Sequence, residues 1–157
     1  MQSADILGRW DIVEWVQRYD DGRQVYPMGR ALEGFIHYDH DYMFVVIARV
    51  GRPPIVASQW TASDEAKAEA YGGYFTYAGG YAIDGDEIVH RVQFSLFPNW
   101  VGSEQRRRVA LKDGALHLTA RMEESTTEAR TAELIWRRQA PESRIGRESR
   151  WNDRGPS

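Results

Sequence analysis

His90 and Arg107 are the two side chains of this 157-residue chain whose types and expected placement could do chemistry. An imidazole can accept or donate a proton near neutral pH. A guanidinium can hold the negative oxygen of an enolate, a phenolate or a carboxylate. The sequence contains no cysteine, which excludes a thiolate nucleophile and any cysteine-ligated metal site. No serine–histidine–aspartate arrangement is visible in the local sequence, so His90 and Arg107 are the catalytic candidates, and proton transfer is the reaction class they support. The alternative for His90 is a core histidine whose ring is bonded to a tyrosine or a glutamine.

The pattern of the strand expected over residues 87–96 places His90 inside the fold. Alternate side chains of a strand point to opposite faces of its sheet. One face of this strand is apolar apart from the histidine, whereas the other carries most of the polar residues. The inward set is Ile88, His90, Val92, Phe94 and Leu96.

The next strand places Arg107 inside by the same argument. Arg107 shares its face with Gln105 and Val109, while Arg106 and Arg108 point outward. The three consecutive arginines therefore do not form one basic patch.

A guanidinium inside a fold needs a partner, because burying an unpaired charge is costly. A structural arrangement would stack Arg107 on an inner aromatic ring and bond it to backbone carbonyls or to Glu14. Water or a ligand anion could also serve as the partner, and the sequence does not decide among these three arrangements. Repulsion by Arg107, together with desolvation, should keep His90 neutral at pH 7, and an anionic ligand placed against Arg107 would relieve this repulsion and raise the pKa of His90.

Aromatic and polar side chains on the same inner faces, or on the loop 97–103, are candidates for contacting a ligand. Loops at the ends of barrels commonly carry binding groups. The alternative for Pro98-Asn99-Trp100 is a turn that the tryptophan merely anchors. The ligand-binding candidates are Tyr38, Tyr77, Tyr81, Asn99, Trp100, Gln105 and Trp136.

Turn signals divide the chain into about eight short strands, mostly joined as hairpins by Asp-Gly and similar pairs. Residues 63–71 break this pattern with an N-cap serine, early acids and several helix formers, and predict one short helix. Eight antiparallel strands in a chain of this length favour an all-β, closed up-and-down barrel with room for one small ligand. A two-sheet sandwich is the alternative. The strand 42–49 is apolar on both faces and cannot be phased.

The segment 37–41 packs four potential metal ligands, His37, Asp39, His40 and Asp41, into five residues. Their spacing across a strand end and a turn fixes no coordination geometry. We therefore expect no metal site and no cofactor, although a haem barrel with one axial histidine is conceivable.

Composition limits the function classes. The length suits one domain, which we place at residues 5–138. The net charge of −3 favours no nucleic-acid partner, and no apolar run is long enough to span a membrane. The N-terminus lacks a signal-peptide pattern, so we expect a cytoplasmic protein. Residues 139–157 lack a periodic apolar face and should form a disordered tail. Trp151 in this tail could dock on a neighbouring subunit, so a homodimer is one possible state.

Several motifs carry a resemblance to a known family. Gly8-Arg9-Trp10 fits the Gly-x-Trp signature of lipocalins, in which an arginine of the last strand, here Arg138, covers the tryptophan. More specific are the stretches at 21–29, 34–43, 52–54 and 77–81, and the run from His90 to Arg107. Over about residues 8–138 the chain resembles the bacterial and fungal lipocalin-like domain family.

The resemblance implies a calycin-type barrel with a small-molecule cavity, but no single activity, because related barrels include carriers, isomerases, cyclases and lyases. We expect binding of a small hydrophobic or aromatic molecule that bears an acidic oxygen. The alternative is a cofactor-independent isomerase, cyclase or lyase that uses His90 and Arg107 in the same cavity.

Overall fold

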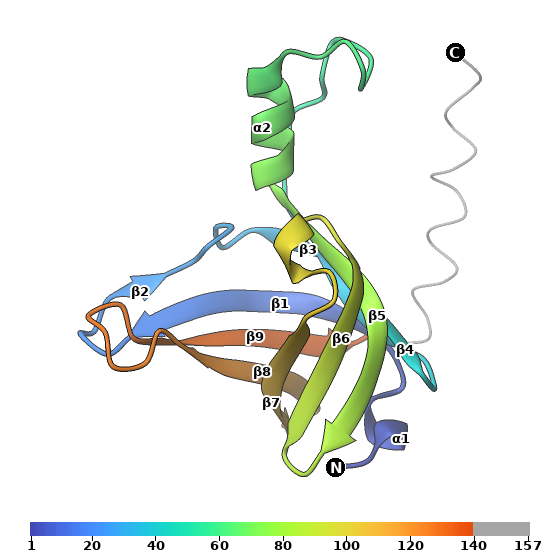
Figure 1. Ribbon diagram of the computed structural model, residues 1–157, viewed down its shortest axis with the longest axis vertical. Helices are drawn as coiled ribbons and strands as arrows, with labels where there is room; N and C mark the ends of the chain where they lie inside the picture. Colours follow the sequence, from blue (N-terminus) through green and yellow to red (C-terminus); the bar gives the residue numbers. More distant parts are fainter. Residues whose placement is uncertain (140–157) are drawn as a thin grey trace.

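The computed structural model describes residues 1–139, which form a closed antiparallel β-barrel (Figure 1). β1 pairs with β3 over residues 8–11 and with β9 over residues 10–19, and this double pairing closes the sheet. The short β2 pairs only with the end of β1. The strands are β1 (Gly8–Tyr19), β2 (Gln24–Val25), β3 (Leu32–Tyr38), β4 (Tyr42–Arg49), β5 (Tyr74–Asp84), β6 (Glu87–Ser95), β7 (Glu104–Lys112), β8 (Ala115–Met122) and β9 (Arg130–Arg138).

The predicted eight-stranded up-and-down barrel with a short helix is confirmed, and the two-sheet sandwich is wrong. Apart from β2, each strand pairs with its neighbours in chain order, as consecutive hairpins require. From residue 140 onward the predicted disordered tail lies outside the described residues, so its disorder remains a prediction.

One end of the barrel is sealed around Trp10. The Arg138 guanidinium lies 4.2 Å from the centre of the Trp10 ring, as the resemblance implied. The Trp10 indole nitrogen donates to the carbonyl of Ile6, at the end of the one-turn helix α1 (Ser3–Ile6). Ile6 is fully buried, so α1 closes this end below the strands (Figure 1). The sequence interpretation did not include this helix.

Strand alternation predicted most of the inner faces correctly. On β6 Ile88 and His90 are buried, and on β3 and β9 the buried side chains include Ile36 and Trp136. The strand that could not be phased, β4, points Met43, Val45 and Ile47 into the core.

A β-bulge corrects the prediction for Phe94. β5 pairs Ala78 with Phe94 but Gly79 with Val92, so Gln93 is an extra residue on β6. The bulge reverses the alternation, and Phe94 is 72% exposed instead of facing inward. Gly79 is required opposite the bulge, because a Cβ atom there would collide with the carbonyl oxygen of Arg91.

The predicted helix over residues 63–71 is α2 (Asp64–Gly72), whose N-cap Ser63 accepts a hydrogen bond from the Ala66 amide. None of its side chains is buried, and it stands above the barrel in Figure 1. Arg52 holds its C-terminal end by donating to the Ala70 carbonyl. Among residues 1–139, no helix is both long enough and apolar enough to cross a membrane.

Candidate functional site

A cavity of about 680 Å³ lies inside the barrel, toward the end that carries α2. Its wall is mostly apolar and rich in aromatic rings. The polar residues that line it, through their side chains or their backbone, include Gln17, Thr76, His90, Ser95, Gln105, Arg106, Arg107 and Arg121. The apolar and aromatic ones include Trp15, Met28, Ile36, Val45, Phe75, Tyr77, Leu96, Trp100, Leu118, Ala120, Ala132, Leu134 and Trp136.

His90 lies between two tyrosine hydroxyls in the cavity wall. Its Nε2 atom is 2.9 Å from Tyr38 Oη, and its Nδ1 atom is 2.6 Å from Tyr77 Oη. Burial, and secondly the nearby charge of Arg107, lower the pKa of His90 to about 3. The imidazole is therefore neutral at physiological pH, in agreement with the expectation from strand alternation.

The three inward tyrosines differ in their access to the cavity. Tyr77 lines it, and burial raises the pKa of Tyr77 to about 12 against the opposing effect of Arg107. Tyr38 lies behind His90 and is 1% exposed, and burial raises its pKa well above the usual value. Tyr81 donates to the Asp39 carbonyl at the sealed end of the barrel. The structure thus brings only Tyr77 of these three candidates into the wall.

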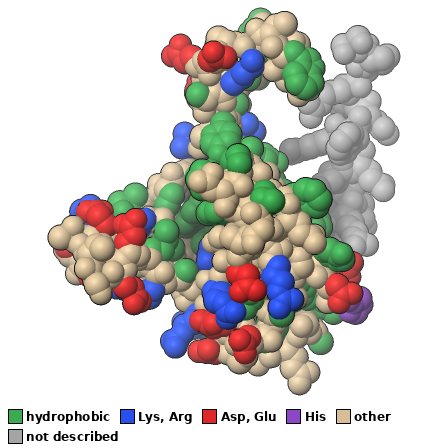
Figure 2. Space-filling view, viewed as in Figure 1, with side chains coloured by type: hydrophobic (Ala, Val, Ile, Leu, Met, Phe, Trp, Pro, Cys, Tyr) green, Lys and Arg blue, Asp and Glu red, His purple; other side chains and the backbone are tan. Residues whose placement is uncertain are grey.

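The Arg107 side chain lines the cavity, and no carboxylate among residues 1–139 forms an ion pair with its guanidinium. Its Nη1 donates to the Arg106 carbonyl at 2.8 Å, and its Nη2 donates to Gln105 Oε1 at 3.2 Å. Glu14, which the sequence offered as a partner, makes no ion pair with it. By contrast, the outward Arg106 and Arg108 face carboxylates, and Figure 2 shows charges of both signs over this face.

Gln105 positions Arg107 and connects it to the loop before β7. Its Oε1 accepts from Arg107, while its Nε2 lies 3.3 Å from Ser103 Oγ, which in turn bonds the Trp100 carbonyl. Both ends of the Gln105 amide are therefore engaged within the protein. This loop contains the short 3₁₀ helix η1 (Pro98–Trp100).

Trp100 fixes the loop against the cavity wall. Its ring packs edge-on against Phe75 at 5.5 Å and against Tyr77 at 5.7 Å between centroids. Asn99, the residue before it, is exposed and does not line the cavity. The structure therefore places Trp100, but not Asn99, where a ligand could touch it.

Trp136 also lies in the wall, and sequence reasoning missed Trp15 beside it. Each indole nitrogen is buried without a hydrogen-bond partner among the described residues. An unpaired buried donor of this kind calls for an explanation, and a functional site is one. A bulge between Ile12 and Glu14 turns Trp15 inward. In the sequence, Ile12 and Trp15 are three residues apart, whereas inward residues of a regular strand are two apart. This spacing could have indicated the bulge.

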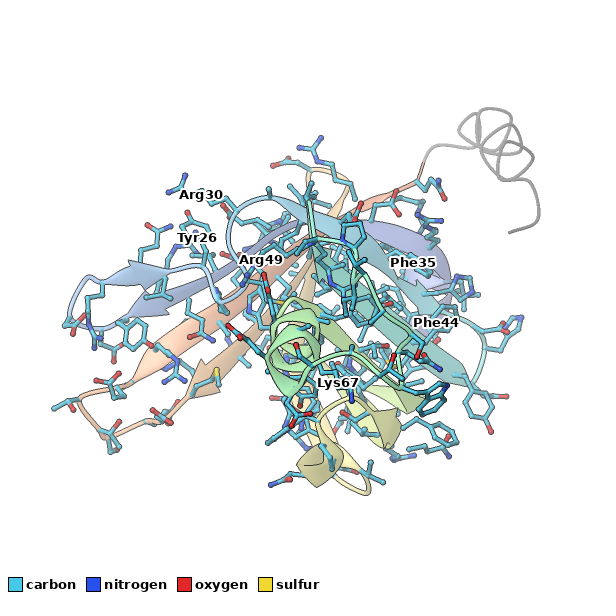
Figure 3. All side chains as sticks on the ribbon, turned by 90° about the horizontal axis from the view of Figure 1, so that it is seen from above. Tyr26, Arg30, Phe35, Phe44, Arg49 and Lys67 are labelled. Atoms are coloured by element: carbon cyan, nitrogen blue, oxygen red, sulfur yellow. The ribbon has the colours of Figure 1, made fainter. Side chains whose placement is uncertain are left out.

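The predicted absence of a metal site remains a prediction, although residues 1–139 hold no cluster of three or more potential metal-ligating side chains. His37 stacks on Phe44, with 5.2 Å between the ring centroids. Phe44 in turn packs edge-on against Phe35, and Figure 3 shows these two side chains together on β3 and β4. His37 thus belongs to an aromatic group that does not line the barrel cavity.

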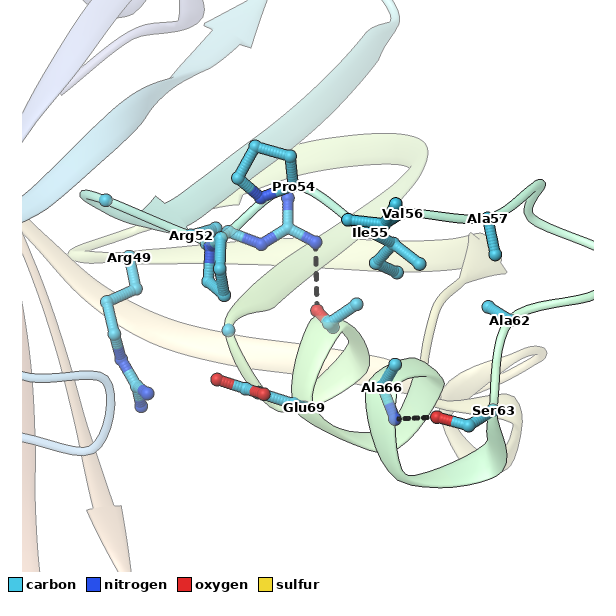
Figure 4. A pocket seen from close by; sticks show the side chains of 14 residues that line it. Arg49, Arg52, Pro54, Ile55, Val56, Ala57, Ala62, Ser63, Ala66 and Glu69 are labelled. Carbon is cyan, nitrogen blue, oxygen red and sulfur yellow. Dashed lines mark hydrogen bonds between the residues drawn. The ribbon is translucent and has the colours of Figure 1, made fainter.

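A second cavity, of about 530 Å³, lies between α2 and the segment 51–57. Figure 4 shows its wall, which includes Arg52, Ile55, Ala66 and Glu69. It shares no residue with the barrel cavity and contains none of the predicted site residues.

Comparisons with known proteins agree with this architecture. The profile of the lipocalin-like domain matches residues 7–139, nearly the whole described part of the chain. The chain belongs to the lipocalin-like domain family. A relative from Aspergillus oryzae, named a 4'-hydroxy-3'-methoxypropiophenone carrier protein, is 28% identical over 86 residues, which cover 49% of this chain and 78% of that protein. No solved structure matches the chain significantly.

Proposed function

We propose that this lipocalin-like protein binds one small aromatic molecule bearing an acidic oxygen inside its barrel cavity. The observation that carries the proposal is Arg107, a cation in a mostly apolar wall with no carboxylate partner among residues 1–139. The guanidinium has N–H donors beyond the two that it uses within the protein. A phenolate, enolate or carboxylate oxygen would accept these hydrogen bonds and balance the charge.

The size and lining of the cavity support a ligand of this class. A volume of about 680 Å³ suits a single small molecule. Trp15, Phe75 and Trp100 offer ring edges and faces to an aromatic ligand. Ala120 and Ala132 pair across β8 and β9, and their small side chains leave space in the wall.

The relative's name supplies a chemical example. A 4'-hydroxy-3'-methoxypropiophenone is both a phenol and an aryl ketone, so it contains an aromatic ring, an acidic oxygen and a carbonyl oxygen. We extend to this chain only the class of a hydroxylated aromatic molecule, with that compound as a probe.

The contacts of His90 favour binding over proton-transfer catalysis. Both ring nitrogens are engaged by tyrosine hydroxyls, so neither is presented directly to a ligand. A group with a pKa of about 3 is also a weak base at neutral pH. In this setting His90 is poorly suited to serve as the general base of an isomerase, cyclase or lyase.

Isothermal titration calorimetry with a panel of phenols, aryl ketones and aromatic acids tests the proposal. One panel member should bind with a stoichiometry of one, and Ala120→Trp, which fills the cavity, should abolish that binding. Ala110→Trp on β7, outside the lining, is the matched control and should retain it. Failure of every panel member to bind, or equal binding by both variants, would contradict a ligand inside the barrel.

A further inference from the structure

The two tyrosines that flank His90 cannot have the same hydrogen-bonding role. A neutral imidazole carries a hydrogen on one ring nitrogen and a lone pair on the other. With Tyr38 at Nε2 and Tyr77 at Nδ1, one hydroxyl must donate to His90 and the other must accept from it. The hydroxyl that accepts keeps its own hydrogen for another partner.

The surroundings decide which tyrosine accepts. Tyr38 is 1% exposed, does not line the cavity, and has His90 as its one hydrogen-bond partner within residues 1–139. If Tyr38 accepted from His90, the hydroxyl hydrogen of Tyr38 would be buried without an acceptor. The fold would then lose the free energy of hydration of that O–H group with nothing in return. Tyr77 lines the cavity, so its hydrogen can point into that space when the oxygen accepts from His90.

We propose that His90 is the Nδ1–H tautomer, so that hydrogen bonds run from Tyr38 through His90 to Tyr77 and leave the Tyr77 hydroxyl hydrogen for an acceptor oxygen of the ligand. This inference rests on the proposed function for its ligand, but the tautomer is a property of the ligand-free protein. It assigns Tyr77 as a direct ligand contact and Tyr38 as a positioning residue.

The chemistry of Tyr77 defines the group that it recognises. Because the pKa of Tyr77 is raised to about 12, the hydroxyl stays protonated and acts as a neutral donor. A protonated hydroxyl donates to neutral and to anionic oxygens, and the proposed function gives the acidic oxygen to Arg107. We therefore assign to Tyr77 a second, neutral acceptor, such as the carbonyl oxygen of an aryl ketone or ester, and the site would then select a ring that carries both groups.

Nitrogen-15 NMR of the imidazole tests the tautomer without any ligand. We expect the hydrogen on Nδ1 and the lone pair on Nε2 in the wild-type protein. The Tyr38→Phe variant removes the donor at Nε2, so the other tautomer should become populated. A wild-type imidazole with its hydrogen on Nε2 would overturn the inference, whether or not any ligand binds.

Binding measurements test the role of Tyr77. Tyr77→Phe should weaken binding of a hydroxyaryl ketone about three- to tenfold, the effect of one neutral hydrogen bond, and should leave the matching hydroxyaryl alkane almost unaffected. Tyr81→Phe, whose hydroxyl donates to the Asp39 carbonyl away from the cavity, is the matched control and should leave binding of both compounds unchanged. Tyr38→Phe should weaken ketone binding by less than Tyr77→Phe does, because it only populates the tautomer in which Tyr77 donates to His90. Equal losses for ketone and alkane would refute the carbonyl contact while leaving the proposed function intact, whereas no binding of either compound to the wild type would count against both.

Discussion

The guanidinium of Arg138 lies 4.2 Å from the centre of the Trp10 ring and donates to the carbonyls of Leu7 and Asp5. It thereby joins the last strand to the first strand, to α1 and to Leu7, which follows that helix. Trp10 is itself 2% exposed and belongs to the main hydrophobic core. This contact secures the sealed end of the barrel, opposite the cavity.

Replacing Arg138 with Met should destabilise the fold by about 1–2 kcal/mol, since it removes a cation–π contact and hydrogen bonds at a partly solvated site. Urea unfolding measures the change in free energy. Arg137→Met, at the adjacent exposed position of β9, is the control and should change stability little. Equal stability of the two variants would show that the stack contributes nothing.

The buried His90 gives stability a specific pH dependence. The unfolded chain binds a proton at this histidine below about pH 6.5, whereas the folded protein binds one only near pH 3. The contribution of the neutral His90 to the free energy of unfolding is therefore fully present above pH 6.5 and is lost as the pH falls toward 3. Between pH 6 and pH 4 the loss should be roughly 2–3 kcal/mol.

The His90→Gln variant isolates this contribution, because glutamine can bond both tyrosines but does not titrate. Urea unfolding at several pH values should give a shallower pH dependence for the variant than for the wild type over this range. Parallel curves would mean that His90 is not held neutral in the folded protein.

The bulge on β6 makes Gly79 and Gly80 differ in their tolerance of a side chain. An added Cβ at Gly79 meets the Arg91 carbonyl, whereas at Gly80 its nearest neighbour is the Asp41 carbonyl oxygen at 3.6 Å. Gly79→Ala should therefore destabilise the protein by about 2–3 kcal/mol or more, as overpacking does. Gly80→Ala should change it by less than about 1 kcal/mol. Thermal and urea unfolding of the pair check this, and a tolerated Gly79→Ala would show that the strands can separate there.

The sequence could predict the barrel and the placement of His90 because hairpin turns and period-two alternation are local signals. They fail where a bulge adds one residue: Phe94 turns outward, and Trp15 turns into the cavity. Strand alternation placed Arg107 correctly, but it could not predict which groups bond its guanidinium. Gln105 and the Arg106 carbonyl are neighbours in the chain, whereas Glu14 needed a tertiary contact that does not form.

The most direct test of the central claim is the affinity of Arg107 variants for a phenol and for its methyl ether, measured by calorimetry at a pH where the phenol is partly ionised. Arg107→Met should weaken phenol binding about ten- to a hundredfold, as expected for a charge-assisted hydrogen bond, and should barely affect the ether. Arg108→Met, on the outer face of the same strand, should leave both unchanged. Equal losses for phenol and ether, or no loss for either, would contradict an acidic oxygen held by Arg107.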